Sequence, residues 1–321
     1  MAPSRAGGRG PKLGRACSLI LSCAAAFGLP PNDVRAADEI QVYNAEIAEV
    51  GQWTIEEHLN YVARGQMQAD FPGGLVPNHS LNGTPELAYG VTEWWELGLY
   101  APFSVASISS SNASSISSNA NSNGGNAMSN NNGGPAQEGP RFYSDAFKLR
   151  TLFVTPDAEK RDFFYGANFE FSYVTPKFAQ TQFLAELRPI IGVRNNGIEL
   201  IVNPIVDFAP GNHGSVDFAP AVRLARKFEK DFSLGFEYYA DFGQIGHFLP
   251  LQQQLHDLFA ITDFKVGDFD VDFGIGHGFT SASDRLIFKM IIGYAFPVTK
   301  DTSGLAKWLQ KSFALSRSDS H

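Results

Sequence analysis

Cysteine, charged residues and long apolar runs are all scarce in this sequence of 321 residues. The two cysteines, Cys17 and Cys23, both lie near the N-terminus, and charged residues make up 18% of the chain. After the N-terminus no apolar run reaches the length of about 18 residues that a membrane-spanning helix needs. These absences exclude a disulfide framework or thiolate metal centre after residue 23, and a helical membrane domain. Phenylalanine and glycine, with 27 and 31 residues, are plentiful.

The first 36 residues have the three parts of a secretory signal peptide. An apolar core spans residues 16–29, the cleavage site is residues 34–36 (VRA), and the basic residues before the core are Arg5, Arg9, Lys12 and Arg15. An uncleaved membrane anchor is the alternative, but this core is about a third short of a bilayer crossing. We therefore expect an exported protein that begins near Ala37.

Two further expectations follow from the cleavage. The remaining chain has no cysteine and carries 20 basic and 32 acidic residues, a formal net charge of −12, which argues against binding nucleic acid. Residues 20–23 (ILSC) resemble a lipidation signal, and lipidation at Cys23 is an alternative to simple cleavage. The apolar stretch before that cysteine is only about seven residues, which disfavours it.

Long strands with one apolar and one polar face dominate the chain after residue 144. Residues 163–173, 232–242 and 269–279 alternate Phe, Tyr, Val, Leu or Ile with Gly, Ser, Asn, Asp or Glu, a pattern typical of strands. Most of the expected strands have about 10 to 13 residues, which exceeds the usual strand of soluble sheets and suits a tilted bilayer crossing. They are 52–63, 85–92, 94–103, 144–154, 162–173, 182–194, 197–208, 216–228, 231–242, 255–266, 268–279 and 285–296.

The connections between these strands alternate in length. Those after odd-numbered strands are long, and most of those after even-numbered strands have about two residues, as in outer-membrane barrels with short periplasmic turns. The sequence therefore predicts an all-β fold, an antiparallel up-and-down transmembrane β-barrel of about twelve strands over residues 37–296, with both termini periplasmic. A soluble sandwich is the alternative, but its core cannot absorb so many successive aromatic positions.

Two segments depart from the barrel pattern. Residues 104–140 consist mainly of Ser, Asn and Gly, so we expect a disordered external loop there. Residues 297–321 form a periplasmic tail in which Leu305, Trp308, Leu309 and Phe313 have helical spacing. The tail is expected to form either a short amphipathic helix or a frayed terminus.

The sequence resembles a known family along most of residues 39–296. The similarity rests on EIQVYNAEIAEVGQWTIEEHLNYVARG (39–65), PELAYGVTEWWELGLYAPF (85–103), RPIIGVRNN (188–196) and GFEYYADFG (235–243). These stretches are similar to outer-membrane proteins of the meta-pathway phenol-degradation type, a group of transporters. The resemblance implies a channel or transporter-like barrel in a Gram-negative outer membrane, for small hydrophobic or aromatic compounds. The insert at 104–140 and the tail after Phe296 depart from the family pattern.

The polar faces of the strands are expected to line the barrel lumen. They carry charges of both signs, and the candidates for a selectivity lining are Lys148, Arg150, Glu170, Glu186, Arg188, Arg223, Glu237 and Asp241. The structural alternative is that opposite charges on adjacent strands only neutralise one another inside a narrow barrel.

No catalytic or metal site is expected from the sequence. His58, His79, His213, His247, His256 and His277 have no spacing of three or four between any two of them, so no metal and no cofactor is predicted. A phospholipase-like enzyme is the alternative from another class, because residues 79–83 (HSLNG) and 212–215 (NHGS) each place a Ser within two positions of a His. Proximity in sequence does not make a triad, however, so we predict that the protein is not an enzyme.

One expected external loop is unusually apolar. Residues 243–254 (GQIGHFLPLQQQ) carry Ile245, Phe248, Leu249 and Leu251, and exposed apolar groups on a loop need an explanation. They are candidates for capturing a hydrophobic solute, for plugging the mouth, or for both. The expected partners are outer-membrane lipid and small hydrophobic solutes. A sealed barrel with a structural or receptor role is the alternative to a channel.

Overall fold

The computed structural model describes residues 39–108, 139–211, 215–229 and 231–297. The expected signal peptide, the expected tail helix and most of the expected Ser/Asn-rich loop lie outside these residues. Within them, no helix is long and apolar enough to cross a membrane.

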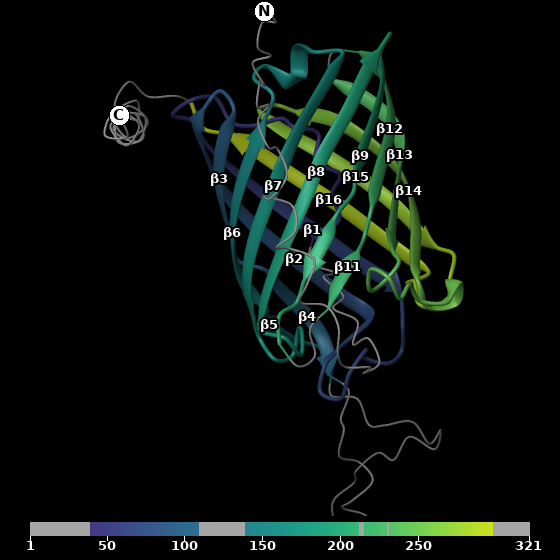
Figure 1. Cartoon of the computed structure of the whole chain (residues 1–321). Helices are drawn as coiled ribbons and strands as arrows, with labels where there is room; N and C mark the ends of the chain where they lie inside the picture. The colour runs from purple at the N-terminus through teal and green to yellow at the C-terminus, as the bar shows by residue number, and fades with distance from the viewer. Residues whose placement is uncertain (1–38, 109–138, 212–214, 230, 298–321) are drawn as a thin grey trace, which may run out of the picture. The chain divides into compact units, whose positions relative to one another are not determined.

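The described residues form a closed antiparallel β-barrel of twelve strands, four of which are interrupted and carry two labels (Figure 1). The strands are β1 (Trp53–Arg64), β2 (Leu75–Thr92), β3 (Trp95–Tyr100) with β4 (Phe103–Ile108), β5 (Arg141–Ser144) with β6 (Ala146–Val154), β7 (Phe163–Val174), β8 (Phe183–Asn195), β9 (Ile198–Asn203) with β10 (Val206–Phe208), β11 (Val216–Phe218) with β12 (Ala221–Glu229), β13 (Phe232–Asp241), β14 (Leu255–Val266), β15 (Phe269–Gly278) and β16 (Leu286–Ala295). The predicted fold class is confirmed.

Pairing of β1 with both β2 and β16 closes the barrel. Closure satisfies the backbone groups that an open sheet would leave unpaired at its edges. Three of the four interruptions contain a proline, namely Pro102, Pro204 and Pro220, which has no N–H to donate to a neighbouring strand. The fourth, between β5 and β6, is Asp145.

Successive connections lie at opposite ends of the barrel, which we call the turn end and the loop end, and the connections at the turn end are short except for residues 155–162. Residues 93–94, 155–162, 196–197 and 267–268 connect strands at the turn end, whereas 65–74, 175–182, 242–254 and 279–285 do so at the loop end. Asn196 and Gly197 both have positive φ, 50° and 78°, as a two-residue hairpin turn of type I′ requires. Two short 3-10 helices, η1 (Ala158–Lys160) and η2 (Leu251–Gln253), lie in these connections.

The alternating residues of each strand face opposite sides of the barrel wall. Phe171 and Phe236 are 56% and 55% exposed, whereas their neighbours Glu170 and Glu237 are 3% and 1% exposed. Apolar side chains therefore cover the outside, and polar ones are buried inside. The apolar part of the interior core lies against β6 to β9 and β12, and includes Val42, Tyr43, Phe164, Ile190 and Ile201.

Two strand boundaries differ from the predicted ones by five residues or more. Strand β2 begins at Leu75 rather than at residue 85, although residues 77–84 contain the turn formers Pro, Asn and Gly. The Phe103 ring packs over Gly83, and an added Cβ would lie 2.1 Å from a ring carbon, so a larger residue here would displace the ring. A register shift between Val76 and Leu81 accommodates the proline. The predicted loop 104–140 also begins too early, because residues 104–108 continue the strand as β4 and pair with β2 and β5.

Candidate functional site

The barrel interior is occupied by residues 39–52, which we call the N-terminal segment. This segment forms no strand and precedes β1. Side chains from four strands bind its backbone: Asn203 (β9) to Tyr43 N and O, Glu96 (β3) to Ala48 N at 2.6 Å, Arg188 (β8) to Gln41 O at 2.9 Å, and Lys289 (β16) to Ile40 O at 3.4 Å. Because these strands come from different parts of the ring, the segment crosses the lumen rather than following one wall.

Tyr43 is the centre of the contacts between the N-terminal segment and the wall. The side chain is 4% exposed, and its hydroxyl lies 2.9 Å from a Glu39 oxygen and 3.0 Å from a Glu170 oxygen. The Arg188 guanidinium lies 4.4 Å from the centre of the ring, a cation–π distance. The ring and the hydroxyl of one tyrosine thus contact both signs of the charged lining.

The candidate lining residues on β6 to β8 form buried ion pairs. Arg150 lies 2.5 Å from both Glu86 and Glu96. The other pairs are Lys148 with Glu170 at 3.7 Å, Lys148 with Glu39 at 3.9 Å and Arg188 with Glu186 at 2.6 Å. Each cation therefore has an acidic neighbour, the arrangement expected when charges are buried inside a protein.

A second charged group joins the five consecutive strands β12 to β16. Arg223 lies 2.7 Å from Glu237 and 3.5 Å from Asp272 and also hydrogen-bonds to Asp263, while Lys289 is fully buried and hydrogen-bonds to Glu237. Sequence analysis did not select Lys289. The sequence pattern could have identified it, because the alternation along β16 places this lysine on the inward face of an otherwise apolar strand.

Asp241 occupies the last position of β13. Its side chain accepts a hydrogen bond from Gly243 N at 2.8 Å, at the loop end of β13. The structure thus places Lys148, Arg150, Glu170, Glu186 and Arg188 near the N-terminal segment, Arg223 and Glu237 in the second group, and Asp241 at the loop end.

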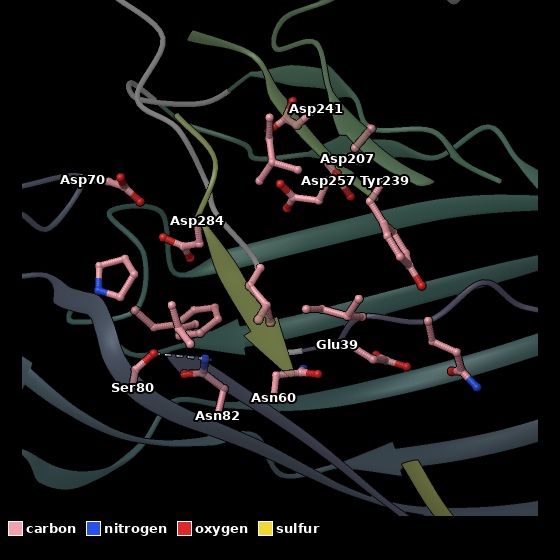
Figure 2. A pocket seen from close by; sticks show the side chains of 18 of the residues that line it. Glu39, Asn60, Asp70, Ser80, Asn82, Asp207, Tyr239, Asp241, Asp257 and Asp284 are labelled. Carbon is pink, nitrogen blue, oxygen red and sulfur yellow. Dashed lines mark hydrogen bonds between the residues drawn. The ribbon is translucent and has the colours of Figure 1, made fainter. Parts of the chain in front are cut away.

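A cavity of about 230 Å³, which we call the loop-end cavity, lies inside the barrel on one side of the N-terminal segment (Figure 2). Its lining includes Glu39, Gln41, Asn60, Phe71, Tyr239 and Phe259. The charged lining residues are Glu39, Asp70, Glu186, Asp207, Asp241, Asp257 and Asp284 against Lys148 and Arg188. The cavity lining therefore contains seven acidic and two basic side chains.

A larger cavity of about 860 Å³, the turn-end cavity, lies on the other side of the segment. Gln41 lines both cavities, whereas residues 42–47 and 49 line only the turn-end cavity. The N-terminal segment therefore separates two internal spaces that would otherwise form one lumen.

The residues predicted to capture solute, and those considered for catalysis, do not come together in a site. In the apolar loop, Ile245, Phe248 and Leu251 are exposed, and none of the four apolar side chains lines the loop-end cavity. His79 is exposed while Ser80 is buried, so these neighbours face opposite sides of β2. Residues 212–214 of the other Ser/His segment lie outside the described residues.

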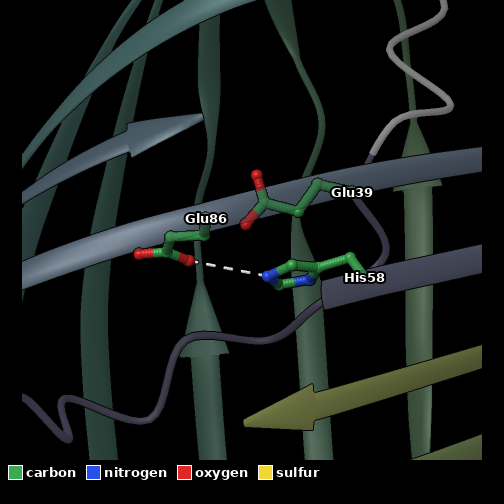
Figure 3. Close-up of side chains that lie close together, drawn as sticks. All are labelled: Glu39, His58 and Glu86. Carbon is green, nitrogen blue, oxygen red and sulfur yellow. Dashed lines mark ion pairs between the residues drawn. The ribbon is translucent and has the colours of Figure 1, made fainter. Parts of the chain in front are cut away.

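Three ionisable side chains from separate segments meet beside Tyr43: Glu39 of the N-terminal segment, His58 of β1 and Glu86 of β2 (Figure 3). One possible ligand atom from each lies within 4.8 Å of the other two. Sequence analysis could not find this group, since no spacing relates residues 39, 58 and 86, and only closure of the barrel brings them together.

The sequence matches no family model and no curated protein. Solved structures of similar fold include the COG4313 outer membrane channel from Pseudomonas putida F1, with 11% identity, a TM-score of 0.50, and coverage of 80% of this chain and 100% of that one. The KdgM porin has 8% identity, a TM-score of 0.45, and coverage of 76% and 99%. The TodX monoaromatic hydrocarbon channel, a deletion mutant, has 8% identity, a TM-score of 0.36, and coverage of 76% and 88%.

At such low identity the likeness concerns the fold alone. The fold of the described residues is that of outer-membrane β-barrels, in agreement with the exposed aromatic outer face.

Proposed function

We propose that this protein is an outer-membrane channel of a Gram-negative bacterium whose N-terminal segment is a movable plug. The outer surface supports the membrane position. Large apolar side chains such as Phe163, Tyr165, Phe171 and Phe236 are each more than half exposed, and a soluble barrel would present them to water. In lipid the same positions are favourable, and closure leaves no unpaired strand edge.

The observation that carries the channel proposal is the division of the lumen. Two cavities of about 230 and 860 Å³ lie on either side of a segment that belongs to no strand. The segment has no strand pairing, and the backbone hydrogen bonds that join it to the wall are those of Gly51 and Gln52 with Gly90, next to β1. Side-chain contacts hold the rest, so residues 39–49 can leave the lumen without opening the barrel wall. Its removal joins the two cavities into one path.

The proposed solutes are small hydrophobic or aromatic compounds, neutral or cationic rather than anionic. A cavity of about 150 Å³ is enough to hold benzene, so the loop-end cavity has room for one aromatic ring beside Phe71, Tyr239 and Phe259. Its carboxylates disfavour anions. The apolar loop 243–254 is proposed to collect such compounds at the rim, and the family resemblance supports the same class.

A sealed structural or receptor barrel is the second candidate. The buried ion pairs and the hydrogen bonds around the N-terminal segment favour it, since they hold the interior together whether or not anything passes. The phospholipase-like alternative has less support, because His79 and Ser80 face opposite sides of the wall.

Conductance in planar bilayers tests the channel against the sealed barrel. The intact protein is compared with a variant that lacks residues 39–49, which keeps the residues adjoining β1. We expect small or rare conductance steps from the intact protein and large, stable steps from the deletion variant. Faster migration of unheated samples on gels verifies that the variant has folded. A folded deletion variant that conducts no better than the intact protein contradicts the plug.

A further inference from the structure

We propose that Glu39, His58 and Glu86 bind a divalent transition-metal ion of the Zn²⁺ type, which fastens the N-terminal segment to the barrel wall. The site concerns the position of the segment and not conduction, so it can be tested separately from the channel proposal.

The donor atoms have the types that Zn²⁺ requires, and one pair of them already has the separation. Zinc binds imidazole nitrogen and carboxylate oxygen at about 2.0–2.2 Å in a tetrahedral arrangement, which places two donor atoms about 3.4 Å apart. The distance from His58 Nε2 to Glu86 Oε2 is 3.5 Å. An oxygen of Glu39 completes the group within 4.8 Å. Small rotations of these side chains are enough to bring three ligands onto one ion.

An independent observation points to a ligand at this place. His58 is 1% exposed, yet within the described part of the chain neither of its ring nitrogens has a hydrogen-bond partner. Oε2 of Glu39 is also buried without one, while its Oε1 accepts from the Tyr43 hydroxyl. Buried polar atoms of this kind are rare in proteins and call for a specific explanation, such as a bound ion.

The charges around the site leave these donor atoms available. Arg150 approaches Glu86 through Oε1, at 2.5 Å, so Oε2 remains directed towards His58. Glu56 Oε2 lies 3.7 Å from His58 Nε2 and adds a third carboxylate. Lys148 Nζ lies 3.9 Å from Oε2 of Glu39, which is longer than a hydrogen bond. The competing interpretation is a protonated His58 paired with Glu56 and Glu86, without any metal.

The mixed ligands select among metals. Imidazole suits Zn²⁺, Cu²⁺ and Ni²⁺, whereas Mg²⁺ and Ca²⁺ prefer sites made of oxygen alone. Two of the three ligands belong to the wall and one to the segment. By linkage, an ion that needs Glu39 favours the state in which the segment is seated in the lumen, and seating of the segment strengthens binding of the ion.

Zinc binding by the full chain, purified in detergent and treated with EDTA before the measurement, tests the site. Titration calorimetry with Zn²⁺ is applied to the unaltered protein, His58→Gln, Glu39→Gln and the control His277→Gln, whose histidine is exposed on the outer face of β15. We expect one Zn²⁺ per chain for the unaltered protein and the control, and at least tenfold weaker binding for the other two.

Three outcomes overturn the proposal. Absence of stoichiometric binding to the unaltered protein means that His58 is held by ion pairs alone. If His58→Gln binds Zn²⁺ as tightly as the unaltered protein, the ion does not bind at His58. If Glu39→Gln binds Zn²⁺ with unchanged affinity while His58→Gln loses it, the ion does not connect the N-terminal segment to the wall. Glu39→Gln lies outside the strands and does not depend on the folding of a variant wall, and channel activity enters none of these measurements.

Discussion

Tyr43 and Asn203, 160 positions apart in the sequence, exchange two hydrogen bonds inside the barrel. Tyr43 N donates to Asn203 Oδ1 at 2.7 Å, and Asn203 Nδ2 donates to Tyr43 O at 3.2 Å. A single side chain of β9 therefore satisfies both backbone groups of a residue that has no strand partner. Asn203 is fully buried.

The first prediction concerns this pair. Asn203→Ala removes both hydrogen bonds and leaves two buried backbone groups without a partner, at a cost of about 1–3 kcal/mol each. Because the contact joins the segment to the wall and no strand depends on it, the N-terminal segment should loosen while the barrel stays folded. We expect more frequent or larger conductance steps in planar bilayers.

Asn203→Gln provides the matched control, since it keeps the amide donor and acceptor without adding a charge and displaces them by one methylene group. Its conductance should lie between those of the unaltered protein and Asn203→Ala. If Asn203→Ala conducts like the unaltered protein, this contact does not hold the segment.

The second prediction concerns the outer face. Phe236→Arg should lower the free energy of unfolding in lipid vesicles by up to about 2–4 kcal/mol, because Phe236 is exposed on the outer face that we propose contacts lipid. Phe236→Leu keeps the position apolar and should cost much less. Equal losses for the two variants would mean that this face does not contact lipid.

The third prediction concerns Gly235, which precedes Phe236 and faces the inside of the barrel. Alternation alone favours tolerance of a larger side chain here. A Cβ at this position, however, would lie 2.5 Å from Leu224 O and 2.8 Å from the Ala225 Cα, both backbone atoms that cannot move aside. We expect Gly235→Ala to destabilise the barrel in urea unfolding, and Ser233→Ala, two positions along the same face, to have a smaller effect.

The fold was predictable from the sequence because strands in lipid reverse the usual distribution of apolar residues. The pair Glu170 and Phe171 already distinguishes the inside from the outside, and the short turns fix the order of the strands. The N-terminal segment was not predictable, since its partners, such as Asn203, lie on strands far along the chain. The early start of β2 was hidden because Gly83 and Pro77 are ordinarily turn residues, and only the Phe103 ring explains the glycine.

The candidate site was predictable only in part. Charged residues on the polar faces were identifiable one by one, but their pairing across strands was not. Lys289 could have been found by extending the alternation through β16. The group of Glu39, His58 and Glu86 depends on both the closure of the barrel and the entry of the segment, and neither leaves a local pattern.

The fourth prediction concerns the buried pair of Lys289 and Glu237. Lys289→Met should lower the free energy of unfolding by up to about 3–5 kcal/mol, because it leaves an excess of buried carboxylate. Arg223, 2.7 Å from Glu237, reduces this cost. The double variant with Glu237→Gln should recover part of the loss in urea unfolding. A loss no greater than that of Lys265→Met, at an exposed pair with Asp270, would show that the buried pair contributes nothing special.

The last prediction concerns the apolar loop. Phe248 packs against Phe218 and Phe242, with ring centres 6.5 and 5.6 Å away, and leaves Ile245 and Leu251 exposed at the loop end. None of these three lines the loop-end cavity, so a capture role requires that solutes collect at the rim and then enter. Each side chain contributes about 1.5–3 kcal/mol when fully buried against a solute, enough to raise its local concentration.

Deletion of residues 245–251 should therefore slow the uptake of aromatic compounds by cells that depend on this protein, while conductance of small ions stays unchanged or rises. The double variant Phe248→Ser/Leu251→Ser should have the same effect on uptake without shortening the loop. Uptake of a small sugar provides the control, because a sugar gains little from apolar contact and should not respond. If aromatic uptake by both variants equals that of the unaltered protein, the loop does not capture solute, and its apolar side chains serve only to cover the rim of the barrel.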